Sequence, residues 1–101
     1  MNRKLEVLKI KQARGRLLVN LNLFYPHAVL VRTLYRTVCD EPSYNKALLL
    51  KDLTYFHDKG YISWCEDVLR DSPEFEERLV KLTATGKEVA EGTITDDALE
   101  I

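Results

Sequence analysis

The chain has 101 residues, of which 46% are hydrophobic and 31% are charged, and its formal net charge is −1. This length and composition indicate one folded domain with a modest core and exclude a disordered chain. No apolar run approaches the roughly 18 residues that a membrane span needs. Charged residues interrupt the N-terminal segment where a secretory signal would be apolar. We therefore expect a cytoplasmic protein without membrane contact.

The charges are distributed unevenly along the chain. Residues 1–36 carry eight Lys or Arg and one acid, whereas residues 64–101 carry four Lys or Arg and eleven acids. This asymmetry predicts a basic face for an anionic partner and an acidic face that avoids one. The alternative is that the two ends attract each other, within the fold or between protomers.

The first predicted element is a helix over residues 3–24, with Asn2 as its N-cap. Residues 17–23 also alternate as a strand would, but helical spacing of apolar residues on both sides of Gly15 favours the helix. Because glycine inside a helix costs about 1 kcal/mol relative to alanine, Gly15 is where a kink or break is expected. An apolar stripe flanked by basic residues is typical of a helix that packs against a second copy. The alternative is that this helix closes the core.

A second helix is expected from Pro26 to about Cys39. Proline is tolerated at the first helical position, where its missing N–H has no helical partner to lose. This helix would bury an apolar face formed by Leu30, Leu34 and Val38. Residues 40–43 follow as a turn, because the residue before a proline is biased away from the helical conformation.

A third helix is expected over residues 44–59, capped by Ser43 and ended by Gly60 in a left-handed conformation. Its predicted buried stripe consists of Ala47, Leu50, Leu53 and Phe56. The residues predicted to point outward are Tyr44, Asn45, Leu48, Lys51, Asp52 and Tyr55.

Two short strands are expected after the third helix. From Tyr61 to Trp64 the apolar period changes from about 3.6 to about 2, and residues 78–82 alternate in the same way. Thr83 is expected to cap a fourth helix over residues 84–91, which Gly92 would end. The acidic tail that follows, residues 93–101, would be frayed or form a short helix.

The sequence shows no catalytic constellation, because it has no phosphate-binding glycine loop, nucleophile elbow or recognisable pair of catalytic carboxylates. The spacing of a metal site is also missing among the candidate ligands Cys39, Cys65, His27 and His57. We therefore expect a protein that is not an enzyme and that holds no metal or cofactor.

Two motifs occur in order along the second half of the chain. The first is Leu-x-x-Phe-x-x-x-Gly-Tyr-Ile, formed by Leu53, Phe56, Gly60, Tyr61 and Ile62. The second is Leu-Thr-x-x-Gly-Lys, formed by Leu82, Thr83, Gly86 and Lys87. With these motifs, residues 26–92 resemble the winged helix-turn-helix of small bacterial and phage-borne transcriptional regulators.

The resemblance implies a single domain with a mainly helical α+β fold. Residues 1–25 would form an N-terminal helix, and a three-helix core would follow it. Residues 26–92 would hold the helix-turn-helix, a small antiparallel β-hairpin called the wing, and a final helix. Residues 93–101 would form an acidic tail. The implied function is a small transcriptional regulator that binds double-stranded DNA, and the minimal size suggests a prophage origin.

The resemblance also implies residue roles, since the third helix would be the recognition helix in the major groove. The implied base-contacting residues are Ser43, Tyr44, Asn45, Lys46, Lys51 and Tyr55. Asn45 would read adenine in a bidentate manner. The residues expected to contact the DNA backbone are Arg14, Arg16, Arg32 and Arg36. A homodimer through the N-terminal helix would place two recognition helices about 34 Å apart.

One loop departs from the family pattern. The predicted wing, Glu66 to Arg78, holds six acids against two arginines, whereas DNA affinity depends on positive charge beside the phosphates. Asp52 on the outward side would add repulsion. The alternative function is therefore a protein-interaction module without DNA binding. Its acidic wing would dock onto a basic partner, and its apolar contacts would come from Leu48 and Tyr55.

Overall fold

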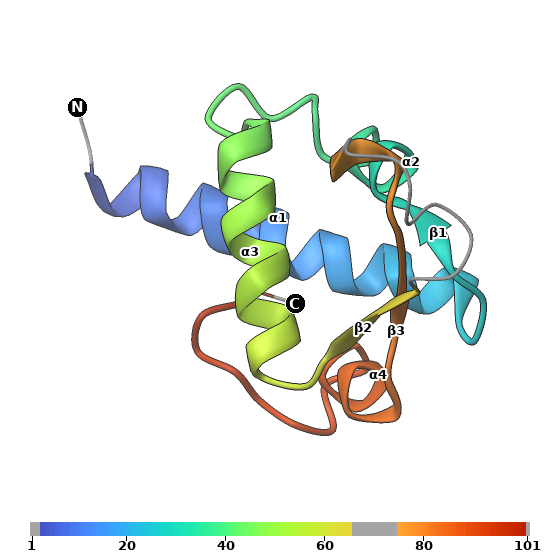
Figure 1. Ribbon diagram of the computed structural model, residues 1–101. Coiled ribbons are helices and arrows are strands. Elements are labelled where there is room, and N and C mark those ends of the chain that lie inside the picture. Colours follow the sequence, from blue (N-terminus) through green and yellow to red (C-terminus); the bar gives the residue numbers. More distant parts are fainter. Residues whose placement is uncertain (1–2, 66–74, 101) are drawn as a thin grey trace.

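The computed structural model describes residues 3–65 and 75–100. Within these residues the fold is α+β, with four α-helices and a small antiparallel sheet (Figure 1). In chain order the elements are α1 (Arg3–Phe24), β1 (Val29–Leu30), α2 (Val31–Tyr35), α3 (Lys46–Asp58), β2 (Ile62–Cys65), η1 (Phe75–Glu77, a 3-10 turn), β3 (Leu79–Leu82) and α4 (Ala84–Ala90). No helix in the two described ranges is long and apolar enough to cross a membrane.

The sheet has the strand order β1-β3-β2, with both neighbours antiparallel to the central strand β3. Val80 pairs with Val29 on one side and with Trp64 on the other. Along β3, Val80 and Leu82 are buried while Lys81 is exposed, which is the two-residue period of a half-buried strand. Both strands of the predicted hairpin are therefore present, shifted by about one residue.

The predicted second helix is wrong in its first half. A turn with a cis Tyr25–Pro26 peptide is followed by the short strand β1, and only Val31–Tyr35 is helical. Over a short apolar run, periodicity alone does not separate strand from helix. Pairing with β3 decides the conformation at Val29 and Leu30, because the ladder satisfies backbone groups that a helix would otherwise satisfy.

Helix α1 has the predicted range and continues through Gly15, so the break expected there does not occur. Its buried side consists of Ala13, Gly15, Leu17, Leu18 and Leu21. Packing of this side against α4 and β3 outweighs the cost of one glycine. The predicted cap, Asn2, lies outside the described residues. In Figure 1 the first turns of α1 extend beyond the other elements.

Helix α3 is rotated relative to the prediction. Its N-cap is Asn45, whose side-chain oxygen accepts the Leu48 N–H at 2.9 Å, and not Ser43. The buried residues are Leu49, Asp52, Leu53 and Phe56. Ala47 and Leu50, predicted to be buried, are exposed instead. The three consecutive leucines at 48–50 are compatible with either side of the helix being buried. The charge of Asp52 favoured the prediction that this residue faces outward, which is wrong.

The ends of α3 and α4 follow the predicted signals. Gly60 and Gly92 adopt positive φ values of 80° and 83°, and Thr83 caps α4 by accepting the Gly86 N–H at 3.0 Å. A Cβ at Gly86 would lie 2.1 Å from the Tyr61 carbonyl oxygen, so only glycine fits at this crossing.

The C-terminal segment after α4 is ordered against the body and is neither frayed nor helical. Leu99 is buried in the core, and the Glu100 N–H donates to the Lys11 carbonyl oxygen at 3.1 Å. The C-terminal segment therefore contacts the middle of helix α1.

Candidate nucleic-acid interface

The candidate interface is the exposed face of α3. Five exposed residues define this face: Lys46, Ala47, Leu50, Lys51 and Thr54. At 3.6 residues per turn they lie opposite the buried side of the helix. Sequence reasoning placed Lys46 and Lys51 here but missed the other three. The spacing of Leu49, Leu53 and Phe56, at i, i+4 and i+7, was a signal for the correct phase.

The remaining predicted base-contacting residues take other roles. Tyr44 is only 4% exposed, which contradicts its predicted contact with DNA bases. Ser43 is half-buried, and its backbone N–H donates to the Glu41 carboxylate at 3.2 Å. Asn45 is exposed, but the cap uses the same side-chain oxygen that a bidentate adenine contact would need.

Arg14 is half-buried and pairs with Asp52, so its guanidinium is already engaged within the protein and its contact with the DNA backbone stays a prediction. The Arg14 Nε donates to Asp52 Oδ1 at 2.8 Å, and its Nη1 donates to the Ala98 carbonyl oxygen at 3.1 Å. The Tyr44 hydroxyl donates to Asp52 Oδ2 at 2.6 Å. Burial and this hydrogen bond raise the pKa of Tyr44 well above its ordinary value. Asp52 was predicted to face DNA, but it is only 2% exposed, and each of its carboxylate oxygens accepts a hydrogen bond within the protein.

The other three arginines lie nearer the surface. Arg16 is exposed and donates to Asp40 at 3.2 Å and to the Thr37 carbonyl oxygen at 3.4 Å. Arg36 is exposed at the C-cap of α2. The guanidinium of Arg32 donates to Glu77 at 3.2 Å. Arg16 and Arg36 are therefore exposed, whereas Arg32, like Arg14, is half-buried.

The end of the predicted acidic wing contacts the candidate interface. Lys46 Nζ lies 2.9 Å from Glu76 Oε2 and 5.9 Å from the centre of the Tyr35 ring. Glu77 pairs with Arg32. The other four acids of the predicted wing, Glu66, Asp67, Asp71 and Glu74, lie outside the described residues. The two acids that are described sit beside cations of α2 and α3.

Tyr55, the last predicted base-contacting residue, faces the C-terminal segment. Its hydroxyl and that of Tyr61 donate to Asp96 Oδ2 at 2.8 Å and 2.7 Å, and the Ala98 N–H donates to Asp96 Oδ1 at 2.9 Å. Burial and the bond to Asp96 raise the pKa of Tyr55 to about 12. Burial opposes ionisation of Asp96, but the bonds from Tyr61, Ala98 and Tyr55 outweigh it and lower the pKa of this carboxyl.

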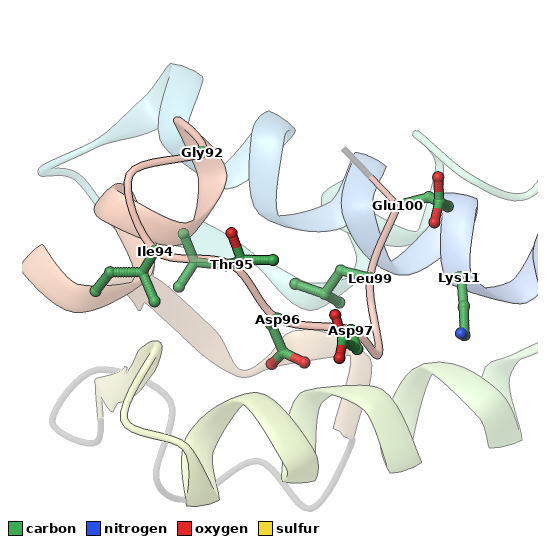
Figure 2. Close-up of a pocket in the computed structure, with 9 residues that line it drawn as sticks. Lys11, Gly92, Ile94, Thr95, Asp96, Asp97, Leu99 and Glu100 are labelled. Carbon is green, nitrogen blue, oxygen red and sulfur yellow. The ribbon is translucent and has the colours of Figure 1, made fainter.

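A depression of about 520 Å³ lies beside this segment, between Lys11 and the residues after Gly92. Figure 2 shows the segment crossing from Gly92 to Glu100, with the Asp96 side chain directed toward α3. Both carboxylate oxygens of Asp96 already accept hydrogen bonds from the protein. This carboxylate therefore fastens the segment to α3.

No group of three or more His, Cys, Asp or Glu within residues 3–65 and 75–100 is arranged to hold a metal ion. Cys39 and Cys65 are free thiols on the described part of the chain. Comparison of the chain with protein-family models, curated proteins and solved structures found no significant match. Arguments about function therefore rest on the geometry.

Proposed function

We propose that this chain is a small DNA-binding regulator of the winged helix-turn-helix class, without enzymatic activity. Residues 26–92 contain α2, α3, β2, β3 and α4 in this order, which is the order helix, helix, strand, strand, helix of the architecture that they resemble. In that architecture α2 and α3 form the helix-turn-helix, and the loop between β2 and β3 is the wing. The central position of β3 in the sheet supports the same assignment.

The observation that carries the proposal is the exposed face of α3. A recognition helix must present side chains to the major groove without other parts of the chain in front of them. Lys46 and Lys51 supply positive charge for phosphates or guanine, and the Thr54 hydroxyl supplies a further polar group. The methyl groups of Ala47 and Leu50 suit the thymine methyl. Thus the face combines the chemistry of backbone and base contacts.

A titration with labelled duplex DNA of random sequence tests this proposal. We expect micromolar binding at about 50 mM salt and much weaker binding at about 200 mM, because non-specific affinity comes from counterion release. Lys51→Ala should weaken binding and reduce the steepness of the salt dependence by about 0.9, the contribution of one phosphate contact. Fluorescence anisotropy measures both quantities.

Lys59→Ala is the matched control, since Lys59 is also exposed but follows α3 at its other end. It should leave affinity close to that of the unmodified chain. The proposal fails if no binding occurs at tens of micromolar in low salt, or if binding is independent of salt. Equal effects of Lys51→Ala and Lys59→Ala would rule out α3 as the recognition helix.

The second candidate function is a protein-interaction module. Leu48 and Tyr55, expected to provide its apolar contacts, pack against the core instead. Leu50 is 47% exposed on the candidate face, which favours this candidate. The acids beside Lys46 and Arg32 favour it as well, because they reduce the charge that DNA would meet. Absence of DNA binding in the titration would leave this candidate as the better proposal.

A further inference from the structure

The turn η1 places two consecutive carboxylates on cations of two different helices. Glu76 pairs with Lys46 at the start of α3, at 2.9 Å, and Glu77 pairs with Arg32 of α2, at 3.2 Å. Both cations are among the residues expected to contact DNA. A phosphate approaching either of them must therefore compete with a carboxylate of the same chain.

Aromatic and backbone contacts hold η1 in the position that brings these two carboxylates close to Lys46 and Arg32. The ring of Phe75 packs edge-on against Trp64 of β2 with centres 6.3 Å apart, and the Arg78 guanidinium lies 4.3 Å from the centre of the Trp64 ring. The Val31 N–H donates to the Arg78 carbonyl oxygen at 2.9 Å, which joins this turn to the start of α2. Because both ends of the turn are anchored, Glu76 and Glu77 stay close to their partners.

The two ion pairs are weak enough to be displaced. Both are partly exposed, with 56% and 33% of the side chains of Lys46 and Glu76 accessible, so water and salt screen them. The Arg14–Asp52 pair differs, since Asp52 is buried and its removal would leave an uncompensated charge. A polyanion with closely spaced phosphates can therefore replace Glu76 and Glu77 but not Asp52.

We propose that η1 is an internal competitor that lowers the affinity of α2 and α3 for nucleic acid. This inference rests on the proposed function. Glu76 and Glu77 occupy Lys46 and Arg32 until phosphates displace them. Binding then requires a ligand whose charge density exceeds that of two carboxylates. Non-specific binding is suppressed most, because it depends almost entirely on phosphate contacts.

The test compares two double variants that change the net charge equally. Glu76→Gln with Glu77→Gln removes the competing carboxylates, whereas Glu88→Gln with Asp97→Asn neutralises two exposed acids on α4 and the C-terminal segment. At about 150 mM salt the Debye length is near 8 Å, so distant charges are largely screened. The first variant should bind random duplex DNA about three- to ten-fold more tightly than the unmodified chain, as expected for two exposed pairs.

The salt dependence provides a second readout. With Lys46 and Arg32 free to contact phosphates, the slope of log affinity against log salt concentration should become steeper by up to about 1.8, at about 0.9 per phosphate contact. The control variant should change both quantities less. If the unmodified chain binds and both variants gain equally, η1 is no competitor while the proposed function stands. If neither the unmodified chain nor either variant binds, the proposed function fails and this inference fails with it.

Discussion

Asp52 shows how a single buried charge is kept in this small core. A carboxylate that is 2% exposed is tolerated only when its charge is paired and its oxygens accept hydrogen bonds. Arg14 and Tyr44 provide both. The pairing residues lie 38 and 8 positions away in the sequence, so helical spacing alone gives no sign of them. Because the sequence gives no sign of these contacts with Asp52, Tyr44 and Arg14 are predicted from sequence to contact DNA.

Replacing Asp52 by alanine is expected to lower the free energy of unfolding by about 2 kcal/mol, because the buried Tyr44 hydroxyl would lose its acceptor and Arg14 its ion pair. Urea denaturation followed by circular dichroism measures this loss. The matched control is Asp58→Ala at the exposed end of the same helix, which should change stability by less than about 0.5 kcal/mol.

A double variant separates charge from packing. Arg14→Met with Asp52→Leu removes both charges and keeps most of the volume, so it should be more stable than Asp52→Ala alone. If Asp52→Ala and Asp58→Ala unfold at the same urea concentration, the Arg14–Asp52 pair does not contribute to the free energy of unfolding.

At the scale of elements, the local signals in the sequence located α1, α3, α4 and two strands within a few residues. Caps and left-handed glycines act on neighbouring residues, so their effects can be read from a short stretch. Strand β1 could not be predicted in this way. Its two residues depend on pairing with β3, about fifty positions later, and the phase of α3 depends on partners contributed by α1.

The close crossing of α4 over the chain after α3 makes Gly86 a sensitive position. In an isolated helix, Gly86→Ala would gain about 1 kcal/mol. Here the added Cβ would meet the Tyr61 carbonyl oxygen at 2.1 Å and Leu82 Cδ1 at 2.7 Å. We expect a net loss of about 2 kcal/mol in the free energy of unfolding, since overpacking forces the backbone to shift. Thermal or urea unfolding gives the sign directly.

Thr85→Ala provides the comparison for Gly86→Ala. Thr85 is the exposed neighbour in the same helix, where alanine has the higher helix propensity. This variant should be as stable as the unmodified chain or slightly more so. A stabilising Gly86→Ala would show that α4 does not approach Tyr61 so closely in solution.

At the scale of the whole molecule, one side of α1 carries exposed apolar residues toward both of its ends, with the exposed Gln12 and Arg16 between them. Its exposed large residues are Leu5, Leu8, Val19 and Leu23. We propose that a second copy of the chain covers them in an antiparallel dimer. Leu5 would then meet Leu23 of the other copy, and Leu8 would meet its Val19, in a contact centred near residue 14. Such mutual pairing is what a two-fold interface requires.

Salt dependence and one variant test this dimer. Because α1 carries six basic residues and one acid, two copies should repel each other at low salt and associate more strongly at high salt. Leu8→Lys should abolish association, whereas Leu50→Lys on α3 should not. Sedimentation velocity across concentrations resolves the two species. A monomer at every salt concentration, or equal disruption by Leu50→Lys, would refute the dimer.

The contacts of the C-terminal segment also bear on the order in which the protein can fold during synthesis. The Ala98 carbonyl oxygen accepts from Arg14, 84 positions earlier, and α1 packs against β3 and α4. Contacts so distant in the chain form late, after long loops have closed. While a ribosome is still translating residues before β3, α1 lacks two of the elements that it packs against, β3 and α4. Helix α1 is therefore made well before the elements that shelter its buried leucines, and these leucines stay open to chaperones until those elements are complete.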